Sequence, residues 1–283
     1  MREAEWIREY PRRVAEEQTS APEAPEPEPT SEQASEQVDR AGVAPVGFTY
    51  FFGRGVLVPL TRLIYRPRIE GKANIPRRGK VIFASNHLSF IDSLVIPMFS
   101  PRPVYFLAKS SYFDGTGIRG WISREFFTAI GATPVQRGAG QAALDALDQQ
   151  RRILASGRAI ALYPEGTRSL DGRLYKGRTG VAFLALEEGA QVVPVGLIAT
   201  NEAMPVGAKL PKRHPRVTIR FGKPIDLSHL GPANSGRARR LATDEIMTAI
   251  HELSGQELAN TYNEVPAANP VERLKQVLPH ERR

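Results

Sequence analysis

Residues 81–92 read VIFASNHLSFID, an apolar run followed by a segment that contains a histidine and an aspartate. The run Val81–Ala84 predicts a buried strand. His87 and Asp92 are five residues apart, and on a single helix this spacing points the two side chains well away from each other. If His87 lies in the loop after the strand and Asp92 in the first turn of a helix, the carboxylate can reach one imidazole nitrogen and leave the other free to take a proton. Such a pair alone is more often a structural hydrogen bond than a catalytic dyad.

From residue 79 onward the chain alternates between strand-like and helical patterns. The expected strands are 80–84, 103–108, 132–136, 158–163, 191–199 and 216–221. The expected helices are 91–99, 118–129, 140–156, 178–188 and 237–254. This alternation predicts a single α/β domain, with a largely parallel mixed sheet flanked by helices.

Composition divides the chain into four expected parts. Residues 1–45 carry 11 acidic and 5 basic side chains and are rich in proline and glutamate, so we expect a disordered arm. Residues 46–68 form an aromatic segment, residues 69–255 the α/β domain, and residues 256–283 a polar, loosely ordered tail.

The balance of charge outside the arm indicates anionic partners. Beyond residue 45 the chain carries 33 basic and 19 acidic side chains. A body of this charge suits phosphorylated substrates, nucleic acid or an acidic membrane surface. The absence of cysteine excludes disulfides and thiolate metal sites and favours a reducing compartment. The five histidines show no metal-ligand spacing, so we expect no metal.

The aromatic segment allows two interpretations. Residues 46–66 contain three phenylalanines and two tyrosines, interrupted by Arg54, Pro59 and Arg62. A membrane-spanning helix requires ~20 largely uncharged apolar residues, and these interruptions argue against one. An amphipathic segment lying in the membrane interface fits the pattern, and so does a helix packed on the domain's own core.

Four groups of polar residues each follow an expected strand. They are His87, Lys109, Arg137 and the run Glu165–Arg168. If the strands are parallel, their carboxyl ends meet at one edge of the sheet, where open α/β folds bind ligands. We therefore expect a base, an acid and several cations in one crevice.

The run Tyr163–Ser169, YPEGTRS, has the residue types of an anion site. Gly166 allows close backbone approach, Thr167 and Ser169 offer hydroxyl donors, and Arg168 offers a planar fork for phosphate. Glu165 repels phosphate, so it either orients Arg168 or accepts from a substrate hydroxyl. A solvated turn with charged decoration fits the run equally well.

Together these blocks resemble the glycerolipid acyltransferases, and most closely the bacterial 1-acyl-glycerol-3-phosphate acyltransferases. The resemblance covers roughly residues 66–225 and places four blocks in the family's order. They are Asn86-His87 with Asp92, Lys109 to Arg137, Tyr163–Ser169 with Lys176-Gly177, and Val193-Pro194-Val195. The second block departs from the family's pattern: no apolar-Pro-x-x-Gly turn follows Lys109, and Gln136 stands where many members have an acidic residue.

The resemblance implies an acyl transfer that produces phosphatidic acid for phospholipid synthesis. An acyl thioester of coenzyme A or acyl carrier protein is the co-substrate, with no further cofactor, and the acceptor is the free hydroxyl of lysophosphatidic acid. His87 is then the general base and Asp92 fixes its tautomer. Substrate binding is assigned to Asn86, Lys109, Arg137, Glu165, Gly166, Thr167, Arg168 and Ser169, and the acyl path to Val193, Pro194 and Val195. A purely structural proline on a strand near the sheet edge explains Pro194 equally well.

The resemblance also favours membrane association of residues 46–68. One substrate lives in the bilayer, so we expect a peripheral protein on the cytoplasmic face of the cell membrane, attracted to anionic lipid. Three other functions remain open: an acyltransferase for glycerol-3-phosphate or another lysolipid, a thioesterase-like hydrolase, and a catalytically silent lipid-binding protein. No recognition motif accompanies the basic charge, so we do not expect nucleic acid as a partner.

Overall fold

The computed structural model describes residues 48–135, 141–208 and 210–263. The expected acidic arm of residues 1–45 and most of the expected tail lie outside these ranges. Arg137 lies outside them as well.

A seven-stranded sheet forms the centre of the described chain, in the order β1-β7-β6-β2-β5-β3-β4. Five strands, from β6 to β4 in that order, are parallel, and β7 and β1 run in the opposite direction. The predicted mixed, largely parallel α/β sheet is therefore confirmed. The strands are β1 Arg68–Glu70, β2 Val81–Ser85, β3 Val104–Lys109, β4 Ala132–Val135, β5 Ala159–Leu162, β6 Gln191–Ile198 and β7 Thr218–Phe221.

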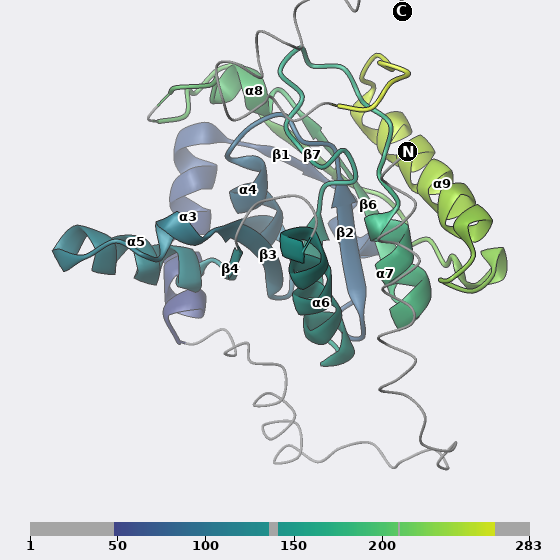
Figure 1. Ribbon diagram of the computed structural model, residues 1–283. Coiled ribbons are helices and arrows are strands. Elements are labelled where there is room, and N and C mark those ends of the chain that lie inside the picture. Colours follow the sequence, from purple (N-terminus) through teal and green to yellow (C-terminus); the bar gives the residue numbers. More distant parts are fainter. Residues whose placement is uncertain (1–47, 136–140, 209, 264–283) are drawn as a thin grey trace, which may run out of the picture.

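Helices cover both faces of the sheet (Figure 1). Side chains alternate along β2, so that Ile82 packs on one face and Phe83 on the other. The core with Ile82 is closed by α6, α7 and α9, and the core with Phe83 by α4 and α5. The helices are α3 Phe48–Tyr65, α4 Asp92–Phe99, α5 Gly117–Ala129, α6 Gln141–Ala155, α7 Gly180–Glu188, α8 Thr200–Ala203 and α9 Gly236–Ser254, with short 3₁₀ turns at Lys72–Asn74, Ser110–Tyr112 and Ser228–Leu230.

The chain leaves two neighbouring strands toward opposite faces of the sheet. β5 is paired along its whole length with Val81–Ala84 of β2. α4 follows β2 and packs on one face, whereas α7 is the next helix after β5 and packs on the other. A crevice at the carboxyl ends of parallel strands is where such folds bind ligands, when neighbouring connections diverge in this way.

The helix α3 has one side docked on the domain and one side exposed. Arg54 donates to the carbonyl of Pro97 at 2.7 Å and also to that of Ser100, at the carboxyl end of α4. A cation is favourable there because the carbonyls of the last helical turn lack partners. Exposed apolar side chains lie along the rest of the helix: Phe51, Phe52, Val56, Leu60 and Leu63. The docked side agrees with a helix packed on the domain, and the membrane interpretation of this segment stays a prediction.

Two expectations about local structure need correction. The segment 256–263, expected to be loosely ordered, makes backbone hydrogen bonds to residues 174 and 176. Pro194, expected on a strand near the sheet edge if it is only structural, lies on the interior strand β6. The carbonyl of Pro194 accepts from Gly222 N at 2.8 Å, and Gly222 has no side chain that would clash with the pyrrolidine ring.

Candidate active site

His87 and Asp92 lie in hydrogen-bonding contact at the carboxyl end of β2. Their side chains meet through His87 Nδ1 and Asp92 Oδ2, 2.9 Å apart. The sequence produces this contact because Asp92 is the first residue of α4, so that its carboxylate turns back over the loop. The same Oδ2 accepts the backbone N–H of Leu88 at 2.6 Å and of Ser89 at 2.7 Å. Asp92 is fully buried and holds the loop as well as the imidazole.

A carboxylate offers only acceptors, so the proton of the imidazole resides on Nδ1. The second ring nitrogen, Nε2, then carries the lone pair and can remove a proton from a substrate. His87 lines a pocket together with Phe90, Ser93, Phe106, Tyr112, Arg168 and other side chains. The site therefore has an oriented base in an open cavity that also contains a cation.

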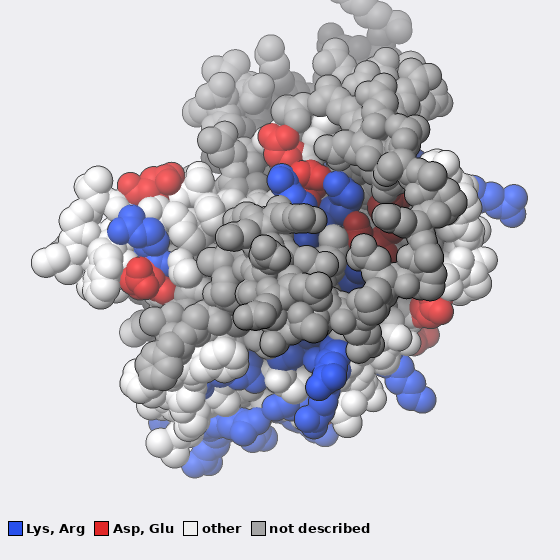
Figure 2. Space-filling view, turned by 90° about the horizontal axis from the view of Figure 1, so that it is seen from below, with Lys and Arg blue, Asp and Glu red and all other residues white. Residues whose placement is uncertain are grey.

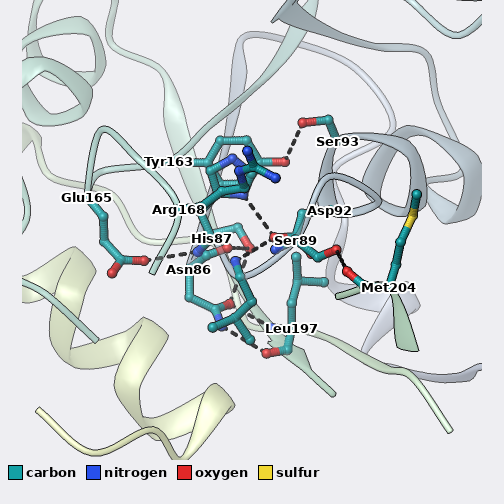
Figure 3. A network of polar contacts seen from close by, with 12 residues as sticks. Asn86, His87, Ser89, Asp92, Ser93, Tyr163, Glu165, Arg168, Leu197 and Met204 are labelled. Atoms are coloured by element: carbon teal, nitrogen blue, oxygen red, sulfur yellow. Dashed lines mark hydrogen bonds and ion pairs between the residues drawn. The ribbon is translucent and has the colours of Figure 1, made fainter. Parts of the chain in front are cut away.

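An aromatic ring that sequence reasoning did not assign to the site packs on the imidazole. Tyr163 stacks on His87 with ring centroids 3.8 Å apart and planes 11° apart (Figure 3). The Tyr163 hydroxyl shares a 3.1 Å hydrogen bond with Ser93 Oγ, which fixes the tyrosine ring against α4. Burial, and next the negative Asp92, raise the pKa of Tyr163, so its hydroxyl stays protonated. The stack holds the plane of the imidazole in a fixed orientation.

Glu165 is turned into the protein and does not face the pocket. Its side chain is 1% exposed. One carboxylate oxygen accepts the backbone N–H of His87 at 2.9 Å, and the other that of Tyr175 at 3.0 Å. Burial raises the pKa of Glu165 to about 7, against the lowering effect of these two N–H groups, with a further raising effect from Asp92. Its expected role in substrate binding is therefore corrected to a clamp on the His87 backbone.

Asn86 and Ser169 are also turned inward, contrary to their expected contact with substrate. The amide of Asn86 exchanges two hydrogen bonds of 2.8 Å with the backbone of Leu197 on β6. Ser169 donates its hydroxyl to Asp171 Oδ1 at 3.1 Å and its N–H to the carbonyl of His87 at 2.7 Å. Both side chains are buried. They position the loops and are closed to a ligand.

The remaining residues of the expected binding set are placed differently. Gly166 is exposed at a positive φ of 79°, and Thr167 and Arg168 are half-buried beside the pocket. Lys109 ends β3, a parallel strand that opens on the same edge of the sheet as β2. The side chain of Arg168 lines the His87 pocket.

The three residues of the expected acyl path lie on β6. Val193 and Val195 are fully buried in the core cluster with Phe83. Pro194 is buried on the same interior strand. An open apolar pocket lies elsewhere, between α3, α4 and α5, and is lined by Tyr50, Arg54, Leu57, Leu94, Pro97, Met98, Phe126 and Ile130. Leu94 also lines the His87 pocket, so the two cavities are neighbours.

Comparisons with known proteins find similarity to acyltransferases. Residues 66–198 match the family model described as Acyltransferase. The chain is 32% identical over 162 residues to the chloroplast 1-acyl-sn-glycerol-3-phosphate acyltransferase LPAT1 of Arabidopsis thaliana, covering 57% of this chain and 44% of that protein. It is 32% identical over 203 residues to a 1-acyl-sn-glycerol-3-phosphate acyltransferase of Chlamydomonas reinhardtii, covering 65% and 59%.

The chain spans about half the length of these curated relatives. Among solved structures, the 1-acyl-sn-glycerophosphate acyltransferase PlsC of Thermotoga maritima aligns with a TM-score of 0.49 and 19% identity, over 87% of this chain and 94% of that one. The match to the family model spans β2 with its histidine, β5 with the Glu165–Arg168 loop, and β6. Residues 66–198 are thus similar to the acyltransferase family.

Proposed function

We propose that the protein transfers a fatty acyl group from a thioester to the free hydroxyl of 1-acyl-glycerol-3-phosphate. The observation that carries this proposal is the oriented His87–Asp92 pair in a pocket shared with Arg168. The names of the relatives support the choice of acceptor. The product is then phosphatidic acid, and the thiol of coenzyme A or acyl carrier protein is released.

In the proposed mechanism His87 acts as general base and then as general acid. Nε2 takes the proton of the acceptor hydroxyl while its oxygen bonds to the thioester carbonyl carbon. The tetrahedral intermediate then expels the thiolate, which receives the proton back from the imidazolium. Asp92, 2.9 Å from Nδ1, stabilises the imidazolium between these two steps. The chain contains no cysteine, and the direct transfer requires no covalent acyl-enzyme.

The two substrates occupy different parts of the site in this proposal. Arg168 binds the phosphate of the acceptor, since its planar guanidinium fits phosphate oxygens in pairs. An acyl chain lies in the apolar pocket between α3, α4 and α5, which borders the His87 pocket at Leu94.

We also propose that the protein lies on the cytoplasmic face of the cell membrane. The exposed apolar side of α3 supports this, as do Ile118, Trp121, Ile122 and Phe126, which are exposed on α5. Seen from below, the left side of the molecule, where α5 protrudes, shows uncharged residues with acidic and basic ones among them, and lysine and arginine side chains gather along the lower rim (Figure 2). Basic side chains next to apolar ones suit an anionic lipid surface. Among the described residues, no helix has the length and hydropathy needed to cross a membrane.

The experiment that tests the activity measures release of free thiol from palmitoyl-coenzyme A and from palmitoyl-acyl carrier protein. Each donor is supplied with and without lysophosphatidic acid, beside His87→Ala. We expect release that requires the acceptor and disappears in the variant. Release without acceptor would identify a thioesterase. Release that persists in folded His87→Ala would remove the general-base assignment. No release from either donor would refute the proposed acceptor.

A further inference from the structure

The chain segment after α9 lies alongside the loop that contains Arg168. We call residues 255–263 the strap and residues 165–178 the phosphate loop. The backbone N–H of Leu174 donates to the carbonyl of Glu257 at 2.8 Å, and Ala259 N donates to the carbonyl of Leu174 at 2.9 Å. Lys176 N donates to the carbonyl of Thr261 at 2.9 Å. The strap thus adds a short parallel ladder to the phosphate loop, from outside the region that matches the family model.

One end of the strap reaches the residue next to the base. Gln256 Oε1 accepts from Asn86 Nδ2 at 2.7 Å, and Gln256 Nε2 donates to the carbonyl of Gly172 at 2.7 Å. Asn86 is fully buried and directly precedes His87. A single side-chain amide therefore joins the loop of the base to the phosphate loop.

The other end of the strap is hydrogen-bonded to the backbone of Arg168, the cation of the site. Asn263 Nδ2 donates to the carbonyl of Arg168 at 3.2 Å. Arg178, at the end of the phosphate loop, donates in turn to the carbonyl of Asn263 at 3.3 Å and lies over the ring of Tyr262. Arg240 on α9 donates to both the Tyr262 hydroxyl and the carbonyl of Gly177, each at 3.1 Å. The strap is therefore tied at both ends.

We propose that the strap is a positioning element of the active site, in which Gln256 orients the base through Asn86 and Asn263 orients Arg168. The inference rests on the proposed function, since it assigns the roles of base and phosphate ligand to His87 and Arg168. It goes beyond that function by giving a role in the reaction to a segment outside the acyltransferase match.

The kinds of contact that the strap makes indicate that it positions the active-site residues, and that stabilising the core is not its main role. Its two large apolar side chains, Leu258 and Tyr262, are 45% and 39% exposed. Each thus leaves more than a third of its surface in water, so the strap buries less apolar surface than a core segment would, and apolar burial is the main source of folding free energy. Apart from the stack of Arg178 on Tyr262, the strap contacts given above are hydrogen bonds, and the two made by the Gln256 and Asn263 side chains toward the site end on Asn86 and Arg168.

The test compares three single variants of the full chain with the parent. Gln256→Met keeps the length of the side chain and loses both hydrogen bonds, and Asn263→Ala loses the bond to Arg168. Glu257→Ala is the matched control, because it changes an exposed side chain of the same strap. With palmitoyl-coenzyme A as donor, we expect Gln256→Met to lower kcat about fivefold with little change in KM for lysophosphatidic acid. We expect Asn263→Ala to raise that KM about fivefold with kcat retained, since each loses hydrogen bonding worth about this factor.

Two readouts that need no turnover separate failure of the strap from failure of the proposed function. Asn263→Ala should bind glycerol-3-phosphate about fivefold more weakly by calorimetry. Gln256→Met should move the imidazole ring signals of His87 in NMR spectra, identified by their loss in His87→Gln, while those of the other four histidines stay in place. If the parent is inactive but Asn263→Ala binds glycerol-3-phosphate more weakly and Gln256→Met shifts the His87 signals, the proposed function fails. The positioning of His87 and Arg168 by the strap is then still supported. If both variants match Glu257→Ala in kinetics, binding and spectra, or only their unfolding temperatures fall, the strap proposal is overturned.

Discussion

The buried carboxylate of Glu165 makes the stability of the protein depend on pH in a way that Glu165→Gln should remove. Glutamine has the same shape and presents one oxygen to the backbone N–H groups of His87 and Tyr175. It carries no charge at any pH. The variant loses one hydrogen bond, a cost that is the same at every pH.

The sign of the pH dependence follows from the raised pKa. Burial moves the pKa of Glu165 from 4.5 to about 7, so between these values the folded protein binds more protons than the unfolded chain. The free energy of unfolding must then fall as pH rises through this window. Each pKa unit corresponds to about 1.4 kcal/mol. Relative to Glu165→Gln, the parent should lose about 2.5 kcal/mol of stability between pH 5 and pH 8.

Urea denaturation of the parent and the variant at pH 5, 6, 7 and 8 measures this difference. Subtracting one unfolding free energy from the other cancels all other titrating groups, provided that these are unaffected by the substitution. Glu257→Gln, at an exposed site, is the control and should follow the parent at every pH. A difference that stays constant within about 0.5 kcal/mol would refute the raised pKa. If the stability difference instead rose with pH, the pKa of Glu165 would be lowered. The two backbone N–H groups would then affect this pKa more strongly than burial does.

Three further variants test the other parts of the site. Arg168→Ala should raise KM for lysophosphatidic acid about 10- to 100-fold with kcat nearly unchanged, because a charged hydrogen bond to phosphate is lost; an unchanged KM in steady-state assays would place the phosphate elsewhere. Tyr163→Leu should lower kcat about tenfold by removing the ring under the imidazole. Tyr163→Phe keeps the ring and should retain most of the kcat of the parent. An equal loss of kcat in Tyr163→Leu and Tyr163→Phe would argue against a role for the stack. Trp121→Asp should weaken sedimentation with anionic vesicles about tenfold, whereas Thr128→Asp, an equal charge at an exposed polar site of α5, should have a much smaller effect.

Much of the fold follows from local patterns in the sequence. The apolar runs mark β2 to β6 to within one or two residues, because a strand buried on both faces requires consecutive apolar side chains. The contact between His87 and Asp92 follows from their places in a loop and a helix start. The strand β1 was not expected, since Arg68–Glu70 carries two charges in three residues and is held by pairing with the distant β7.

The inward orientation of the polar residues was not accessible from sequence. Glu165 has the residue type of a substrate contact, but its partners are backbone N–H groups 78 and 10 residues away. Backbone donors leave no trace in the identity of the residues that provide them. Gln256 is in the same position, because its partner Asn86 is 170 residues away. By contrast, Tyr163 directly precedes the Pro164–Arg168 run at the end of β5, so its place beside His87 was deducible once β2 and β5 were known to be neighbours.

α4 and α7 follow neighbouring strands but pack on opposite faces of the sheet. Substitutions around the apolar pocket and substitutions in the loop with Glu165 and Arg168 therefore affect different elements. The wall around the apolar pocket comes from α3, α4 and α5, on one side of the sheet. The loop with Glu165 and Arg168 leads to α7 and is tied to the strap after α9, on the other side. Under the proposed function, substitutions on α3 and α5 would reshape the space for the acyl chain while the phosphate loop keeps its backbone. Substitutions in the phosphate loop would in turn change the headgroup site without moving α3 or α5, so preferences for chain length and headgroup would evolve separately.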